Sequence, residues 1–96
     1  MNENVKDQLY SEKFREQLEK GMAFPGYYPF KFIVKADTDA RKKIEAVFEG
    51  TGANIATAPS SKGNYVSLTI TMKASSPDDI IEKYTKVADI PDVIKL

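Results

Sequence analysis

A short polar stretch in the second half of the chain carries the residue types best suited to hold a ligand. The segment 60–65, Ser-Ser-Lys-Gly-Asn-Tyr, brings hydroxyls, a cation, a glycine and an amide close together. Backbone N–H groups of a glycine turn beside a lysine can hold a carboxylate or a phosphate. We therefore predict a candidate ligand-binding site for a small-molecule or anionic effector, made of Ser61, Lys62, Gly63, Asn64 and Tyr65.

An ordinary hairpin loop would have the same composition. Pro59 fixes φ, Gly63 tolerates a positive φ, and Asn64 bonds readily to nearby backbone, so each favours a reversal of the chain. A strand with alternating side chains follows from Tyr65 to Lys73. The stretch can thus be a simple connection into that strand, and this alternative to a binding site stays open.

The residue types that most often carry catalysis are missing. The chain has no cysteine and no histidine, which removes thiolate nucleophiles, disulfides, and the commonest general base and metal ligand. We predict that the protein is not an enzyme and uses no metal or cofactor.

The net charge of the chain bears on its partners. Its 14 basic residues balance 14 acidic ones, and a neutral chain lacks the broad positive field that binds phosphate backbones. Nucleic acid is therefore not an expected partner.

Membrane and export signals are not evident in the sequence. No apolar run approaches the roughly 18 residues of a spanning helix. The first residues, Met1 to Asn4, are polar and acidic, whereas a signal peptide begins with a basic segment and an apolar core. We expect a cytoplasmic protein with no membrane partner.

Two well-patterned strands are expected to form the middle of a sheet. From Tyr65 to Lys73, and again from Phe30 to Ala36, every second side chain is apolar, which places one face of each strand on a core. The inward residues would be Phe30, Phe32, Val34, Val66, Leu68, Ile70 and Met72. Shorter strands are predicted at 53–58 and 93–96, and residues 24–29 are predicted to be a turn-prone entry to the sheet.

A helix is predicted between the first two strands. Its apolar residues have the spacing of a core-facing stripe, Ala40, Ile44, Val47 and Phe48. Asp37 or Thr38 can cap it, because a short polar side chain can accept a hydrogen bond from a free N–H of the first turn.

A second helix is predicted after the long strand. Ser76 is suited to the N-cap and Pro77 to the first helical position. The helix must end by residue 90, because Pro91 disfavours helix for the residue before it. Its buried residues would be Ile80, Tyr84, Val87 and Ala88.

A further helix is expected at the start of the chain, from about residue 4 to residue 20. Apolar residues recur there at four-residue spacing, Tyr10, Phe14, Leu18 and Met22, and Gly21 ends the helix. A single helix of this length is marginal alone, so it either docks this stripe or frays, and both alternatives stay open. We assign 1–23 to an N-terminal helical extension and 24–96 to the main domain.

The order of elements in the main domain is strand, helix, strand, strand, helix, strand. Right-handed crossovers with both helices on one face lead to a ferredoxin-like βαββαβ two-layer sandwich of the α+β class. Its four-stranded antiparallel sheet would have the order 4-1-3-2, with the best-patterned strands in the middle. The uncovered face would be largely polar, with Lys31, Ile33, Lys35, Tyr65, Ser67, Thr69, Thr71 and Lys73.

Two functions that occur on this fold are disfavoured by particular residues. RNA-recognition domains place stacking aromatic residues on the third strand, but Asn64 and Val66 occupy those positions here. Acylphosphatase-type enzymes need a glycine loop after the first strand to cradle phosphate. Residues 36–39, Ala-Asp-Thr-Asp, have no glycine there and carry acids that repel an anion.

Three motifs spread along the chain point to a family resemblance. They are Phe24-Pro25 leading into Phe30-Lys31-Phe32, the loop Ser61-Lys62-Gly63-Asn64-Tyr65, and Ile90-Pro91-Asp92-Val93-Ile94. With these motifs, residues 23–96 resemble the YbeD-like family of small bacterial proteins of unknown function. The resemblance implies a cytoplasmic ACT-like domain, similar to small-molecule-sensing regulatory modules of amino-acid biosynthetic enzymes, and it implies no established activity. Ligand-binding ACT domains have a glycine in the turn after the first strand, and this chain has none there.

Two hypotheses of function follow. The first is a non-catalytic regulatory or interaction module that acts through a protein partner or as a homodimer, by pairing through an edge or a face of the sheet. The second is a small-molecule or anion sensor that uses the Ser60–Tyr65 loop.

Overall fold

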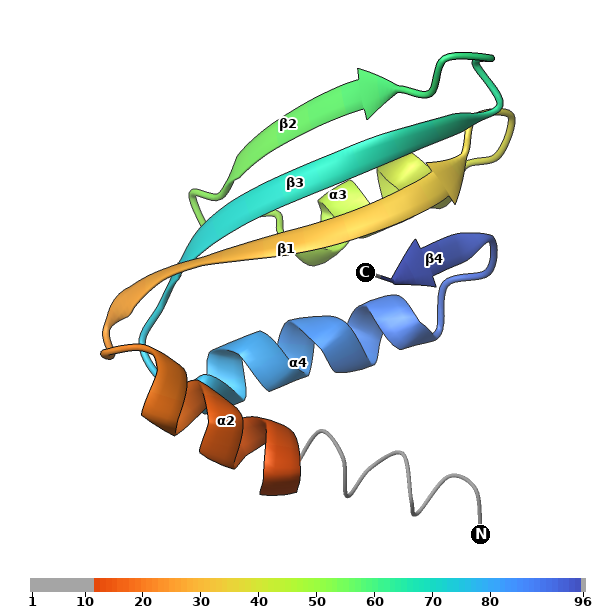
Figure 1. The fold of residues 1–96 in the computed structure, drawn as a ribbon. Helices are drawn as coiled ribbons and strands as arrows, with labels where there is room; N and C mark the ends of the chain where they lie inside the picture. Colours follow the sequence, from red (N-terminus) through yellow and green to blue (C-terminus); the bar gives the residue numbers. More distant parts are fainter. Residues whose placement is uncertain (1–11, 96) are drawn as a thin grey trace, which may run out of the picture.

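Two long strands, β1 (Gly26–Lys35) and β3 (Tyr65–Ala74), form the centre of the sheet in the computed structural model, which describes residues 12–95 (Figure 1). Their antiparallel register runs without a break from Gly26 opposite Ala74 to Lys35 opposite Tyr65. β2 (Asn54–Pro59) pairs with β3, and β4 (Val93–Lys95) pairs with β1. The order β2-β3-β1-β4, with antiparallel pairs throughout, confirms the predicted ferredoxin-like arrangement.

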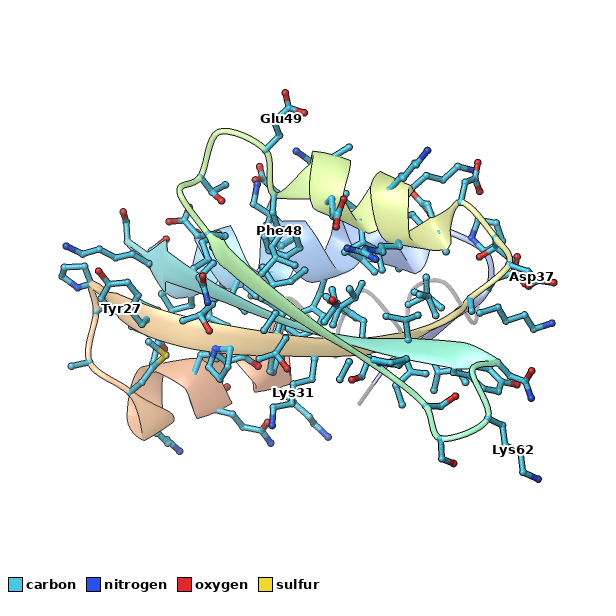
Figure 2. The ribbon with its side chains drawn as sticks, turned by 90° about the horizontal axis from the view of Figure 1, so that it is seen from above. Tyr27, Lys31, Asp37, Phe48, Glu49 and Lys62 are labelled. Carbon is cyan, nitrogen blue, oxygen red and sulfur yellow. The ribbon has the colours of Figure 1, made fainter. Side chains whose placement is uncertain are left out.

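Two helices, α3 (Ala40–Val47) and α4 (Pro77–Ala88), lie on one side of the sheet (Figure 2). The other side is open except at the start of β1, where α2 (Phe14–Gly21) lies. The alternating side chains of β1 and β3 bury their apolar members against these helices, and Phe32 and Leu68 point inward as predicted, each fully buried. Burial of a side chain of this size contributes about 1.5–3 kcal/mol. No helix within residues 12–95 has the length and apolar character needed to cross a bilayer.

β1 begins four residues earlier than predicted, so the expected turn before Phe30 is wrong from Gly26 onward. Proline in a central strand normally argues against strand structure, because it cannot donate to the ladder. Pro29 fits here because β4 reaches only from Phe32 to Val34, so that Pro29 has a strand neighbour only on the β3 side. The short last strand therefore makes the long first strand possible.

The starts of α3 and α4 use side chains near the predicted caps. The Thr38 hydroxyl accepts a hydrogen bond from the Ala40 N–H at 3.3 Å. Ser76 occupies the N-cap of α4 as predicted, but its side chain makes no capping bond. The Asp79 carboxylate instead accepts a hydrogen bond from the Ser75 N–H at 2.8 Å, which ties the entering chain to the first turn. At the other end, Ala88 is half-buried and not part of the core, in contrast to the prediction.

The N-terminal helix docks its apolar stripe in the part that the structure describes, α2 (Phe14–Gly21). Leu18 is buried in the common core, and the Phe14 ring lies 5.5 Å from the Tyr84 ring of α4 with edge-to-face geometry. Arg15 forms an ion pair with Asp78 at the start of α4, and Figure 1 shows the two helices side by side there. Tyr10, the first residue of the predicted stripe, lies outside the described residues.

Candidate functional site

The loop between β2 and β3 is held closed by its own hydrogen bonds. The Ser60 N–H donates to the Tyr65 carbonyl at 2.8 Å, and the Gly63 N–H donates to the Ser60 carbonyl at 3.0 Å. The Ser60 hydroxyl accepts a hydrogen bond from the Tyr65 N–H at 3.1 Å. The N–H groups of Gly63 and Tyr65 are therefore already used inside the turn, which leaves fewer of them for an anion than the sequence suggests.

A polar hollow of about 360 Å³ lies where this loop meets the connection between β1 and α3. The Ala36 N–H donates to the Asn64 carbonyl at 2.9 Å and joins the two loops. Six residues line the hollow: Lys35, Ala36, Asp37, Gly63, Asn64 and Tyr65. It thus carries one cation, Lys35, and one carboxylate, Asp37, neither of which is among the predicted ligand-binding residues.

The five predicted ligand-binding residues are divided by this geometry. Gly63, Asn64 and Tyr65 lie together at the polar hollow, whereas Ser61 and Lys62 do not line it. Lys62 projects from the tip of the loop away from the sheet (Figure 2). The structure therefore brings three of the predicted residues into one place, and it turns the predicted cation outward.

A second hollow, of about 320 Å³ and mainly apolar, lies on the open face of the sheet. Its lining comes from all four strands and the loop: Ile33, Ala58, Pro59, Ser60, Tyr65, Ser67 and Ile94. Ile33 of β1 lies directly opposite Ile94 of β4, whose side chain is 50% exposed. The sequence predicted that Ile33 lies on the open face. Its position opposite Ile94 depends on the pairing of β1 with β4, which no local sequence pattern indicates.

The open face of the sheet carries basic and no acidic side chains. β1, β2, β3 and β4 contain no aspartate or glutamate. Lys31, Lys35 and Lys73 belong to the exposed positions of β1 and β3, and Lys31 projects away from α3 and α4 in Figure 2. Within residues 12–95 the acids therefore lie only on helices and loops, and the strands carry lysines alone.

The outer edge of β2 has no neighbouring strand among residues 12–95. Each residue of β2 is uncharged, and all but Ile55 are exposed. Proteins usually protect a free edge with charged side chains, proline or a covering element. On β2 the single proline, Pro59, is the last residue, so the segment before it keeps an unprotected edge.

Comparison with protein-family models shows the family of the chain. Residues 19–96 match the model of a family described as "Protein of unknown function (DUF493)". The chain belongs to this family. A UPF0250 protein of Shewanella piezotolerans is 33% identical over 88 residues, covering 88% of this chain and 96% of its own length. Another from Shewanella oneidensis is 34% identical over 88 residues, with the same coverage. Membership of this DUF493/UPF0250 family, which includes the YbeD-like proteins, confirms the resemblance seen in the motifs.

Solved structures place the DUF493 family member among ACT-like folds. Protein HP0495 from H. pylori has a TM-score of 0.61 with 16% identity, over 77% of this chain and 82% of that one. The ACT domain of GTP pyrophosphokinase from Chlorobium tepidum has a TM-score of 0.58 with 11% identity, over 72% of this chain and 91% of that one. At such identities the similarity shows the fold alone.

Proposed function

We propose that this DUF493 protein is a non-catalytic regulatory module that works as a homodimer, in which β2 of one copy pairs with β2 of the other. The observation that carries the proposal is the free, exposed and uncharged edge of β2. Unpaired backbone N–H and C=O groups on such an edge form a template for another strand. Antiparallel pairing of two identical edges is self-complementary, as a two-fold symmetric dimer requires.

The rest of the molecule is consistent with a role in binding. The chain lacks cysteine and histidine, and among residues 12–95 no acidic or basic side chain is buried and no cluster of metal-ligating side chains forms. In the proposed dimer the two sheets join into one continuous sheet, with α3 and α4 of both copies on one side. The chain would then contribute surfaces, and not reactive groups, to whatever process it regulates.

A lysine on the edge tests this proposal. Thr57 is exposed near the centre of β2, so Thr57→Lys places like charges close together across a two-fold axis. Light scattering coupled to gel filtration should give twice the chain mass for the unmodified protein and for Thr57→Val, and the chain mass for Thr57→Lys. Thr85→Lys, at an exposed position of α4, is the matched control and should stay dimeric. A Thr57→Lys protein with the same mass as the unmodified one would refute pairing through β2.

A second candidate function is a small-molecule sensor at the Ser60–Tyr65 loop. The observation in its favour is the polar hollow, where Gly63, Asn64 and Tyr65 meet Lys35 and Asp37. A cation and a carboxylate in one hollow suit a ligand that carries both charges better than a simple anion.

Thermal-shift measurements with amino acids, nucleotides and acyl compounds test the sensor. A ligand at about 100 times its dissociation constant stabilises the folded state by roughly 2.7 kcal/mol. The shift should disappear in Asp37→Asn and persist in Lys62→Ala, because Lys62 projects away from the hollow. No shift with any compound of the three classes would remove this candidate.

A further inference from the structure

Most basic residues of the helices have an acidic partner, whereas the lysines of the open face have none among residues 12–95. On the helices, five basic residues each lie within ion-pair distance of a carboxylate: Arg15, Arg41, Lys43, Lys83 and Lys86. On the open face, the side chains of Lys31, Lys35 and Lys73 have no ion pair or hydrogen bond within residues 12–95. Lysines on a face whose strands contain no acid create a positive potential that attracts an acidic partner.

The apolar hollow lies between two of these lysines. Lys31, Ile33 and Lys35 are successive residues on the open face of β1, and Ile33 forms part of the floor of the hollow. Lys31 and Lys35 are four residues apart on the strand, which corresponds to about 13 Å. The face thus offers an apolar floor with a cation on each side of it along the strand.

From this arrangement we infer that the open face binds an acidic amphipathic helix of another protein. An aliphatic side chain of that helix fills the hollow over Ile33 and Ile94, and carboxylates on either side of it meet Lys31 and Lys35. Residues two turns apart on one face of a helix are about 11 Å apart, and the flexible lysine stems take up the difference from the strand spacing. A helix laid on the open face would complete a three-layer arrangement of the kind that covers both faces of a sheet.

The same face is poorly suited to a second copy of this chain. Face-to-face packing of two copies would bring the unpaired lysines of both against each other with no acid between them. Like charges at an interface cost affinity and exclude such partners. Ala58 and Pro59 of β2 help to line the hollow, but Lys31, Ile33 and Lys35 all lie on β1, with β3 between them and β2. Binding of a single helix there does not require the dimer.

Single-stranded nucleic acid is also a poorer fit than an acidic helix. Tyr27 is 69% exposed and lies opposite Lys73, whereas Tyr65 is 38% exposed and lies opposite Lys35. The two rings are thus at opposite ends of β1, about 26 Å apart along the strand. Neighbouring bases stack on aromatic residues that lie close together, and this face has no such pair.

Two synthetic helical peptides of about 16 residues test the inference. One presents glutamate, leucine and glutamate on a single face, with the glutamates two turns apart, and the other has lysine in place of glutamate. Each is titrated to about 1 mM, a range that detects weak binding, into ¹⁵N-labelled protein. We expect saturable shifts of the amide signals of Ile33, Ser67 and Ile94 with the glutamate peptide, and none with the lysine peptide.

Charge-reversed proteins complete the test. Lys31→Glu with Lys35→Glu should weaken binding of the glutamate peptide at least about tenfold, because attraction becomes repulsion at both contacts. Lys42→Glu with Lys43→Glu changes the net charge equally on α3, on the other side of the sheet, and should leave the affinity within about twofold. Thermal melting of both proteins verifies that they are folded.

Three results would overturn the inference. One is the absence of shifts on the open face with the glutamate peptide, and another is equal binding of the two peptides. The third is tighter binding of a single-stranded oligonucleotide than of the glutamate peptide, abolished by the Lys31 and Lys35 reversals. The peptide titration and the Lys31 and Lys35 reversals report binding at β1, whereas the mass of Thr57→Lys reports pairing at β2, so failure here is distinguishable from failure of the dimer.

Discussion

Gly63 determines the shape of the loop in which ligand binding was predicted. Its φ of 76° lies in the left-handed region, and an added Cβ would meet no atom within 4 Å. The cost of a side chain at this position is therefore purely conformational. The loop therefore requires glycine at this position whether or not a ligand binds.

Gly63→Ala should lower the free energy of unfolding by about 1–2 kcal/mol, the cost of a left-handed L-residue. Gly21→Ala is the matched control, because Gly21 has a negative or extended φ and equally open space. We expect that control to be neutral or slightly stabilising. Urea denaturation of the two variants measures both values, and equal losses would show that the loop does not depend on the glycine conformation.

The core also contains one polar contact between aromatic residues. The hydroxyls of Tyr28 and Tyr84 lie 3.0 Å apart, and the Tyr84 ring is 5.0 Å from the Phe30 ring. A hydrogen bond of this kind contributes about 0.5–1.5 kcal/mol net. It connects the first half of β1 to α4, at the place where β4 no longer covers β1.

A double-mutant cycle with Tyr28→Phe and Tyr84→Phe isolates this bond. The loss in the double variant should be smaller than the sum of the single losses, with a coupling of about 0.5–1.5 kcal/mol. Chemical denaturation supplies the four free energies of unfolding. Strict additivity would mean that the two hydroxyls do not bond in solution.

On the scale of elements, α2 extends the core at the start of α4. β4 covers only Phe32 to Val34 of β1, and α2 packs beside the start of α4 with Leu18 in the core. The N-terminal helix thus shares the core of the main domain. Its exposed ion pair between Arg15 and Asp78 adds little, because surface ion pairs contribute about 0–1 kcal/mol.

Leu18→Ala should therefore destabilise the protein by about 2–5 kcal/mol, the range for a buried leucine. Gln17→Ala, at an exposed position of the same helix, should change the free energy by less than about 0.5 kcal/mol. Thermal and urea denaturation give both values. A Leu18→Ala protein as stable as Gln17→Ala would indicate that α2 is frayed in solution.

Local sequence patterns predicted the elements in which the spacing of apolar residues indicates the buried face. β3, the centre of β1 and both crossover helices have the periodicity of their buried faces, and Pro77 marks the start of α4. The strand character of residues 26–29 was missed because Pro29 argues against a central strand. Only the shortness of β4, a long-range fact, leaves room for that proline beside β1.

Less of the candidate site than of the fold could be predicted, because its geometry depends on contacts between segments that are distant in the sequence. The sequence indicates that Gly63 and Asn64 form a turn, but it does not show that Ser60 satisfies two N–H groups of the loop. It also does not show that Lys62 turns outward, or that Ile94 meets Ile33 across β1 and β4. These features depend on how loops and strands meet in space.

On the scale of the whole molecule, the surfaces have separate characters. The helical side carries mixed and paired charges, the open face carries unpaired lysines around an apolar hollow, and the β2 edge carries no charge at all. In the proposed account the edge joins two copies, which places two open faces on the same side of one continuous sheet. An acidic partner would then meet a doubled binding surface, and its avidity would depend on the dimer.

The most direct test of β2 pairing uses the absence of cysteine from the chain. Single cysteines are introduced by Ala56→Cys, Thr57→Cys and Ala58→Cys, with Thr85→Cys on α4 as control, and each protein is oxidised and its mass measured without reductant. In a two-fold antiparallel pair, one residue of β2 lies opposite its own copy at a separation of about 5 Å, within disulfide reach. We predict rapid formation of a covalent dimer for one of the three β2 variants and not for the control. Equal, slow cross-linking of all four proteins would contradict dimerisation through this edge.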